Sequence, residues 1–205
     1  MITFVCVKVG DKYGPDYVNR LRRGVATHYK PDEPLAHRFI CLTDDRQGLE
    51  CTWTPVGTDL SGWWAKLILF KPHPALVGRV IYLDLDTIIC DSIDWIAEYR
   101  GPLAILRDFY QPSGWGSAIM SFQAGMHPQV WRNFHPSDME HFTGDQDWIK
   151  AQVGKADLWQ DLHPGKIGSY KVDKLAEGPG KHAVVCFHGE PRPHEVGGWV
   201  AERWR

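Results

Sequence analysis

The sequence has 205 residues, of which 43% are hydrophobic and 23% are charged, and its formal net charge is -2. This length and composition are typical of one globular domain with a full hydrophobic core. The nearly neutral balance lacks the basic excess of nucleic-acid-binding proteins, so we expect no nucleic-acid partner. The apolar runs are all much shorter than the roughly 20 residues that span a bilayer, and the first residues lack a signal-peptide pattern, so we expect no transmembrane anchor.

The five cysteines are odd in number and widely spaced. Four of them lie in or beside apolar runs, namely Cys6, Cys41, Cys90 and Cys186. This pattern indicates buried, reduced thiols and predicts a cytoplasmic protein. The sequence has no Cys-x-x-Cys pair, which disfavours a zinc ribbon.

The first apolar run predicts a strand over residues 2–9, followed by a loop over residues 10–14. This loop lacks the Gly-x-Gly-x-x-Gly pattern, which disfavours a dinucleotide-binding fold. Tyr13 in the loop is a candidate to stack on a nucleotide base, and the alternative is an ordinary turn residue. Beyond the loop, apolar residues three and four positions apart predict a helix over residues 16–29, and a further apolar run predicts a strand over residues 37–42.

Residues 61–70 are predicted to form a helix that is apolar on nearly every side. Lys66 lies within this helix, and two interpretations of it stay open. Its ammonium group either turns out to water along an apolar surface or reaches the ends of the strands. In the second case it meets a phosphate or a sugar hydroxyl, which would make Lys66 a binding residue.

A buried strand predicted over residues 79–83 runs directly into Asp84 and Asp86. The residues before Asp84 are apolar on both faces, which is typical of a central strand in a parallel sheet. If the strand continues, both carboxylates point to the same side and repel each other unless a cation lies between them. A divalent cation with oxygen ligands is the natural partner, and the alternative is a polar strand end that faces water.

Two further apolar runs predict strands over residues 103–106 and 117–122. Trp115 lies in the loop between them. An exposed indole offers a flat apolar face to a sugar ring, so Trp115 is a candidate surface for an acceptor.

A helix is predicted over residues 145–153, and it begins with Asp145 and Gln146. An aspartate at a helix start often serves only to satisfy free backbone N–H groups, and a surface glutamine is common, so a binding role is one of two interpretations. The last apolar run predicts a strand over residues 183–187, which ends at His188. This histidine is a candidate third ligand beside the two aspartates, and the alternative is an ordinary histidine, one of ten in the chain.

In chain order, strands and helices alternate. This predicts an α/β fold, with one domain over residues 1–205 and a mostly parallel central sheet flanked by helices. Ligands of such sheets bind beyond the carboxyl ends of the strands. Gly189 would let the backbone approach a ligand closely, and the planar guanidinium of Arg192 can bind phosphate oxygens, although it would equally suit a solvated surface arginine.

Five segments resemble glycosyltransferase family 8 and its relatives, and they occur in the order found in that family. They are residues 64–67, 82–87, 117–122, 145–147 and 187–193. Residues 82–87 are similar to the family's metal-binding Asp-x-Asp segment, and residues 187–193 are similar to its closing His-Gly-x-x-Lys-Pro segment. Arg192 and His194 stand where the family usually has lysine and tryptophan.

The resemblance implies a GT-A fold, which is a Rossmann-like nucleotide-diphospho-sugar transferase domain. It implies transfer of a sugar from a nucleotide-sugar donor, which we expect to be UDP-linked, to a saccharide or glycolipid acceptor, with retention at the anomeric carbon. It also implies Mn²⁺ or Mg²⁺ held by Asp84, Asp86 and His188. Asp145 and Gln146 would hold the donor sugar, with Gln146 near the reacting face. The remaining candidate donor contacts are Lys66, Asp84, Ser117, Gly189 and Arg192, together with Tyr13, which is a candidate from its place in the loop after the first strand.

Three other functions stay open. Phosphatases of the haloacid dehalogenase type also carry an apolar strand followed by Asp-x-Asp, and Asp84 would be their nucleophile here. In that family one residue usually separates the second aspartate from a threonine, whereas Thr87 follows Asp86 directly. A nucleotidyltransferase usually has a Gly-rich basic loop after the first strand, of which residues 10–14 are a poor version. The third alternative is a protein that binds a nucleotide-sugar without turnover.

Overall fold

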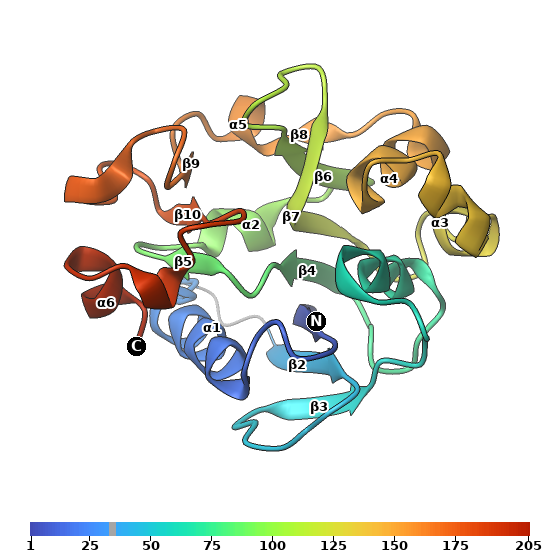
Figure 1. The fold of residues 1–205 in the computed structure, drawn as a ribbon, viewed down its shortest axis with the longest axis horizontal. Helices are drawn as coiled ribbons and strands as arrows, with labels where there is room; N and C mark the ends of the chain where they lie inside the picture. Colours follow the sequence, from blue (N-terminus) through green and yellow to red (C-terminus); the bar gives the residue numbers. More distant parts are fainter. Residues whose placement is uncertain (33–35) are drawn as a thin grey trace.

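The computed structural model describes residues 1–32 and 36–205. Its main element is a seven-stranded sheet with the strand order β3-β2-β1-β4-β7-β6-β8. The strands are β1 Ile2–Lys8, β2 His37–Thr43, β3 Thr52–Pro55, β4 Arg79–Leu83, β6 Leu103–Arg107, β7 Trp115–Gln123 and β8 Asp157–Leu158. Figure 1 shows this order from β3 at the bottom to β8 at the top.

The sheet is mostly parallel, as predicted, but β7 is antiparallel to both of its neighbours, β4 and β6. Leu83 at the end of β4 is paired with Ile119 in the middle of β7. The amino-terminal half of β7 therefore extends past the carboxyl end of β4. This geometry brings Ser117 to the edge of the sheet where ligands are expected, although Ser117 lies in the first half of its strand and not at its carboxyl end.

A second, three-stranded sheet follows the order β5-β10-β9. Its strands are β5 Thr87–Ile89, β9 Ile167–Ser169 and β10 Val184–Cys186. The chain leaves β4 at Leu83, turns over residues 84–86 and enters β5. The strand therefore does not continue through Asp84 and Asp86, and these residues lie in a turn at the junction of the two sheets.

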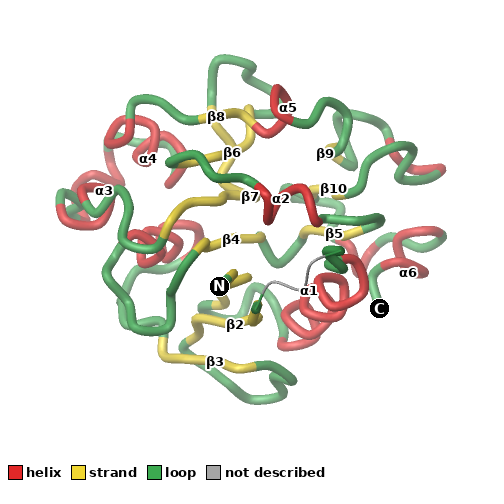
Figure 2. The backbone as a smooth tube through the Cα atoms, turned by 180° about the vertical axis from the view of Figure 1, so that it is seen from behind, coloured by secondary structure: helices red, strands yellow, loops and turns green. Residues whose placement is uncertain are grey.

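Helices cover both faces of the main sheet and enclose two hydrophobic cores. One core contains residues of α1 Pro15–His28, α2 Asp94–Glu98, α5 Trp159–Leu162, α6 Trp199–Arg203 and the small sheet. The other contains residues of the 3-10 helix η1 Gly62–Phe70, α3 Gln129–Arg132 and α4 Asp145–Val153. Along β1, Phe4 faces the first core and Val5 the second, because successive side chains of a strand point to opposite faces. Figure 2 shows the same two layers from behind.

The remaining short elements are the 3-10 helices η2 Pro136–Glu140, η3 Leu175–Glu177 and η4 Pro193–Glu195. The helix predicted over residues 61–70 is a 3-10 helix, and its residues from Trp64 to Phe70 are all buried. All five cysteines are free thiols, and four of them are buried. In the part of the chain that the structure describes, no helix is long and apolar enough to cross a membrane.

Candidate active site

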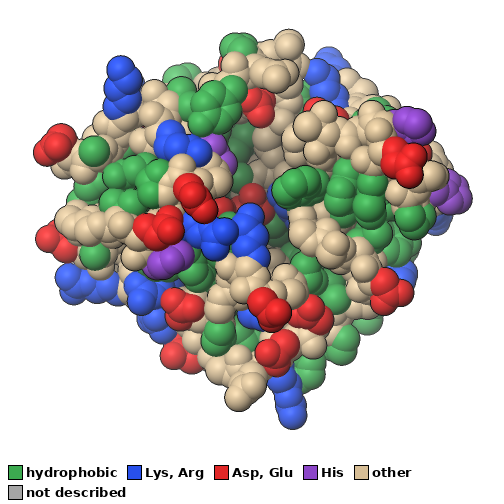
Figure 3. Space-filling model, in the orientation of Figure 1, with side chains coloured by type: hydrophobic (Ala, Val, Ile, Leu, Met, Phe, Trp, Pro, Cys, Tyr) green, Lys and Arg blue, Asp and Glu red, His purple; other side chains and the backbone are tan. Residues whose placement is uncertain are grey.

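A cleft of about 510 Å³ opens beyond the carboxyl ends of β1, β4, β6 and β10. Figure 3 shows this face of the molecule hollowed near its centre, where acidic and basic side chains come together. The cleft is lined by most of the residues predicted from the sequence: Tyr13, Lys66, Asp84, Asp86, Ser117, Asp145, Gln146, His188 and Gly189. Residues far apart in the sequence are therefore brought to one site, and Arg192 lies just outside its lining.

The carboxylates of Asp84 and Asp86 are each held by a phenol. Tyr82 donates a hydrogen bond to Oδ1 of Asp84, and Tyr13 donates one to Oδ2 of Asp86 at 2.6 Å. Asp86 is only 7% exposed. Burial, followed by the negative charge of Asp84, raises the pKa of Asp86 to about 6, and the hydrogen bond from Tyr13 opposes this rise. The turn thus places two carboxylates close enough to disfavour each other's charge.

Lys66 joins this pair to α4 and β7. Its Nζ donates to Oγ of Ser117 at 2.8 Å and lies 3.3 Å from Asp84 Oδ1 and 3.5 Å from Asp145 Oδ2. Burial alone would lower the pKa of Lys66, but the carboxylates of Asp145 and Asp84 outweigh it, so this pKa is raised. Because these three partners line the cleft, the ammonium group of Lys66 reaches the ends of the strands and does not turn out to water. Its contact with a phosphate or a sugar hydroxyl stays a prediction.

Asp145 is 1% exposed, and neither of its carboxylate oxygens has a hydrogen-bond partner among the described residues. Burial raises the pKa of Asp145, and the nearby Lys66 opposes that rise. The side chain does not cap α4, since the residue before the helix is Gly144 and no side-chain cap is formed. Buried acceptors without donors are rare in folded proteins, so Asp145 is well placed to accept hydrogen bonds from a ligand.

Gln146 follows in the first turn of α4, and its amide folds back over Gly144. A Cβ atom added at Gly144 would lie 2.7 Å from Oε1 and 2.8 Å from Nε2 of Gln146. The glycine therefore makes room for the glutamine amide at the wall of the cleft.

His188 lines the cleft but is held by a neighbour. Its Nε2 is 2.7 Å from Oγ of the fully buried Ser169, and its ring stacks on Phe109 with centroids 5.6 Å apart. Burial and then the positive charge of Lys171 lower the pKa of His188, which favours the neutral imidazole. A neutral imidazole is the form that binds metals.

The carboxylate pair has the donor chemistry that Mn²⁺ and Mg²⁺ prefer. A cation beside Asp84 and Asp86 would also relieve the repulsion that raises the pKa of Asp86. Within residues 1–32 and 36–205, however, no three His, Cys, Asp or Glu side chains are arranged to hold a metal ion. The two aspartates therefore fit a divalent cation, whereas the role of His188 as a third ligand stays a prediction.

The far wall of the cleft is formed by the chain beyond β10. Gly189 has a φ of +73°, a conformation that side-chain-bearing residues rarely adopt, and a Cβ atom there would lie 3.4 Å from Nζ of Lys171. Arg192 packs its guanidinium 5.8 Å from the centre of the Tyr13 ring, and its Nη1 lies 3.5 Å from the carbonyl oxygen of Lys12. The side chains of Lys171 and Arg192 thus bring two positive charges to this end of the cleft.

Several residues at the site carry no spacing signal in the sequence. Tyr82 lines the cleft from inside β4 and contacts Asp84. Ser169 in β9 contacts His188, and Lys171 lies beside Gly189. Trp63 also lines the cleft and is 52% exposed. Its exposure could not be told from that of its neighbour Trp64, which is buried.

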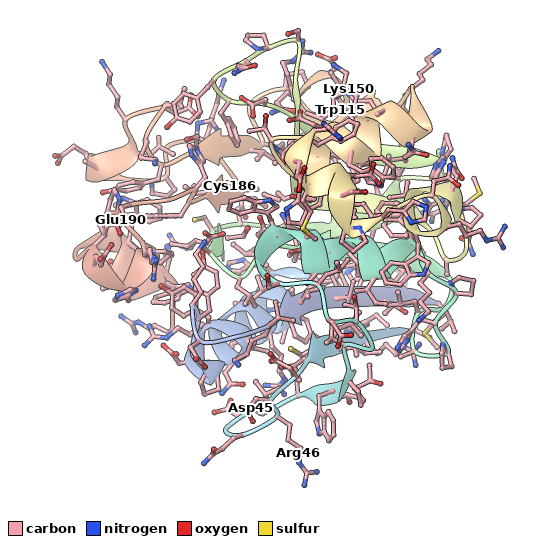
Figure 4. All side chains as sticks on the ribbon, turned by 45° about the vertical axis from the view of Figure 1, so that its right-hand side comes forward. Asp45, Arg46, Trp115, Lys150, Cys186 and Glu190 are labelled. Carbon is pink, nitrogen blue, oxygen red and sulfur yellow. The ribbon has the colours of Figure 1, made fainter. Side chains whose placement is uncertain are left out.

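The expectation that Trp115 offers an exposed surface is wrong. Trp115 is 7% exposed, begins β7 and pairs with Arg107. Figure 4 labels it near Lys150, which donates a hydrogen bond to the carbonyl oxygen of Ser113. The loop that was expected to expose this indole is therefore shorter than predicted, and the ring belongs to the core on the η1 side of the sheet.

Solved structures of glycosyltransferases share this fold. The galactosyltransferase LgtC, in complex with donor and acceptor sugar analogs, superposes with a TM-score of 0.66 at 16% identity, over 98% of this chain and 93% of LgtC. GlyE from Streptococcus pneumoniae TIGR4 gives a TM-score of 0.68 at 13% identity, over 98% of this chain and 58% of GlyE. The bifunctional WbbM gives 0.65 at 12% identity, over 94% of this chain and 46% of WbbM.

These likenesses confirm the predicted GT-A fold. The chain spans nearly all of LgtC but about half of GlyE and WbbM. Comparison with models of known protein families finds no match, and comparison with curated proteins finds none either.

Proposed function

We propose that this protein is a metal-dependent glycosyltransferase that uses a nucleotide-diphospho-sugar as its donor. We expect the nucleotide to be UDP. The observation that carries the proposal is the meeting of Asp84, Asp86, Lys66 and Asp145 in one cleft. This cleft lies at the carboxyl ends of the strands in a fold shared with a galactosyltransferase that was solved with donor and acceptor sugar analogs. Mn²⁺ or Mg²⁺ is the expected cation, with Asp84 and Asp86 as its protein ligands and His188 as the candidate third.

Each part of the donor has matching residues. The half-exposed ring of Tyr13 offers a face to the base. Gly189 lets the backbone approach the diphosphate, and Lys171 and Arg192 supply positive charge at the same end of the cleft. When bound, a divalent cation would act as a Lewis acid on the phosphate oxygens of the leaving group.

We infer that Asp145 and Gln146 orient the donor sugar. The carboxylate of Asp145 keeps unused acceptor positions beside its ion pair with Lys66, and these can accept hydrogen bonds from sugar hydroxyl groups. The ion pair with Lys66 restricts the position of this carboxylate before a ligand arrives. We assign Gln146 to the reacting face of the sugar, and we expect retention of configuration at the anomeric carbon.

The acceptor is proposed to be a saccharide or the sugar part of a glycolipid. Trp63 supports this class, because its exposed indole lies on the wall of the cleft and presents a flat apolar face. Sugar rings pack on such faces while their hydroxyl groups stay in water.

The test is calorimetric titration with UDP, GDP and CDP, with and without Mn²⁺, for the wild type and Asp86→Asn. Asp45→Asn is a matched control, since Asp45 is exposed and Figure 4 shows it in a loop at the bottom of the view, well away from Cys186 at the end of β10. We expect one diphosphate to bind with Mn²⁺ dependence in the wild type and control but not in Asp86→Asn.

Incubation with the matching nucleotide-sugar and a panel of saccharides then measures transfer. Binding without transfer or donor hydrolysis would instead favour a nucleotide-sugar-binding protein. No nucleotide binding, together with phosphate release from simple esters, would favour the phosphatase with Asp84 as nucleophile.

A further inference from the structure

The two aspartates of the site are held in the same manner. Tyr82, 2% exposed in β4, donates its hydroxyl to Oδ1 of Asp84. Tyr13, half-buried in the loop after β1, donates its hydroxyl to Oδ2 of Asp86 at 2.6 Å. One phenol comes from a strand and the other from a loop, yet each donates to one oxygen of one carboxylate.

The hydrogen bonds leave room for a cation. An ionised carboxylate offers about four lone-pair positions on its two oxygens, and a phenol uses one of them. Oδ1 of Asp86 makes no hydrogen bond to a described residue, and Asp86 lines the cleft although it is only 7% exposed. Nζ of Lys66 makes long contacts with both oxygens of Asp84, at 3.3 Å to Oδ1 and 3.4 Å to Oδ2. Each carboxylate therefore keeps lone-pair positions beyond the one that its phenol uses.

We propose that Tyr13 and Tyr82 are positioning residues that orient the carboxylates of Asp86 and Asp84 for a divalent cation. This inference rests on the proposed use of the two aspartates as cation ligands. Carboxylates that bind metals are commonly hydrogen-bonded by outer residues, and loss of such a partner typically weakens metal binding about 10- to 100-fold. The phenols act on the cation through the aspartates and have no contact of their own with it.

The backbone of the turn over residues 84–86 is fixed by hydrogen bonds, so the orientation of the two carboxylates depends on their side chains. The N–H of Asp84 donates to the carbonyl oxygen of Ala118 at 2.8 Å, and the carbonyl oxygen of Asp86 accepts from Phe187 at 3.0 Å. The main chain is thus fixed by both sheets. The directions of the two carboxylates depend on their side-chain partners, which are a phenol for each and, for Asp84, also the ammonium group of Lys66. A phenol on one oxygen restricts the rotation of its carboxylate before the cation arrives.

If Tyr13 competed with the cation for Asp86, removal of its hydroxyl would change the cation affinity in the opposite direction. If Tyr13 occupied a position that the cation needs, its removal would strengthen cation binding. The direction of the change therefore separates a positioning hydroxyl from a competing one, and both substitutions to phenylalanine keep the ring.

The test measures Mn²⁺ affinity without nucleotide, by calorimetry and by electron paramagnetic resonance, in Tyr13→Phe and Tyr82→Phe. Tyr17→Phe is the matched control, because Tyr17 packs on Tyr13 with centroids 4.7 Å apart but bonds to His194. We expect each test variant to bind Mn²⁺ about 10-fold more weakly than the wild type, with the control unchanged. Circular dichroism and thermal unfolding check that each variant is folded. Because Tyr82 is buried, Tyr13→Phe decides the outcome if Tyr82→Phe is unstable.

Unchanged or tighter Mn²⁺ binding in a folded Tyr13→Phe would overturn the inference, as would a wild type that binds no Mn²⁺. The result is separate from the proposed function. Weaker Mn²⁺ binding in the variants, with no sugar transfer by the wild type, would support the positioning role and reject the transferase. Sugar transfer by the wild type, with unchanged Mn²⁺ affinity in the variants, would do the reverse.

Discussion

Nζ of Lys66 lies 3.5 Å from Oδ2 of Asp145, and both residues are almost completely enclosed, with 8% and 1% of their surfaces exposed. The pair joins η1 to the first residue of α4, two elements that cover the same face of the main sheet. A buried pair of this kind adds little net stability compared with apolar residues of the same size, but loss of one partner leaves an uncompensated charge. The floor of the cleft therefore depends on both residues being present.

Lys66→Met is expected to destabilise the protein by about 3–5 kcal/mol in urea unfolding at pH 7, because Asp145 loses its nearest cation. The control is Lys155→Met at an exposed position, which we expect to stay within about 0.5 kcal/mol of the wild type. The double variant Lys66→Met, Asp145→Asn should recover part of the loss. A single variant as stable as the wild type would contradict the importance of this pair.

Asp86→Asn is expected to stabilise the ligand-free protein at neutral pH. The pKa of Asp86 rises from its ordinary value of 3.8 to about 6 in the folded state, so the folded state binds this proton more tightly than the unfolded state does. The stability that this proton provides is complete below pH 4 and is lost as the pH rises through 6. At pH 7 the variant lacks the buried charge and should be more stable by up to about 3 kcal/mol.

Urea unfolding in the presence of EDTA, from pH 4 to pH 7, measures this difference for Asp86→Asn, the wild type and Asp45→Asn. We expect the stability of the variant to depend less on pH between 4 and 6 than that of the other two proteins. An Asp86→Asn protein less stable than the wild type at pH 7 would show that burial does not penalise this carboxylate.

Gly144→Ala is expected to impair turnover through Gln146. The added methyl group would lie 2.7 Å from Oε1 of Gln146 and would push the amide out of its position. The φ of Gly144 is −169°, which alanine adopts without strain, so the effect comes from this contact. We expect the rate of sugar transfer to fall about 10-fold, or about 1.4 kcal/mol, with nucleotide affinity nearly unchanged.

Steady-state kinetics and calorimetry of the same preparations check this expectation. Gly197→Ala is the control, because a Cβ atom there would have no neighbour within 4 Å. Equal rates of sugar transfer in Gly144→Ala and the wild type would contradict the assignment of Gln146 to the reacting face of the sugar.

A nucleoside without phosphates is expected to change the affinity for Mn²⁺. The ring of Tyr13 lines the cleft while its hydroxyl holds Asp86, so a base that packs on the ring acts on the cation site without touching the cation. We expect a several-fold change in Mn²⁺ affinity with saturating nucleoside, and an equal change in nucleoside affinity with Mn²⁺, as linkage requires. Titrations in both orders measure the two. Tyr13→Phe should abolish the coupling, and coupling that persists in this variant would have to follow another route.

The central part of the fold could be predicted from the sequence because its signals are long or strongly apolar. The strand over residues 79–83 and the helix over residues 145–153 coincide with β4 and α4. The position of Asp84 and Asp86 at the end of a buried strand was enough to locate the cleft. The strands β3, β5, β8 and β9 are short, so their residues carry too few alternations to mark a strand.

The arrangement of strands could not be predicted in the same way. An antiparallel β7 and a parallel one have the same apolar run, and direction is decided by how the chain returns across the sheet. The burial of Trp115 could not be predicted for a related reason. Trp115 is in the core because β7 already begins at this residue, and its neighbours in the sequence do not show where the strand begins. The contacts of Tyr82 and Ser169 depend on side-chain directions in three dimensions, which no spacing in the sequence records.

The small sheet also sets the order in which the cleft is completed. Its β5 begins directly after the aspartates, but its partner β10 and the wall at His188 and Gly189 come late in the chain. During synthesis on the ribosome, Ile88 and Ile89 can contact α1, which is made earlier, but their strand partner β10 is made much later. Pairing across so long a separation is slow compared with local contacts. The ability to bind ligand is therefore gained last, and ligand binding during synthesis would report a domain whose two sheets have already joined.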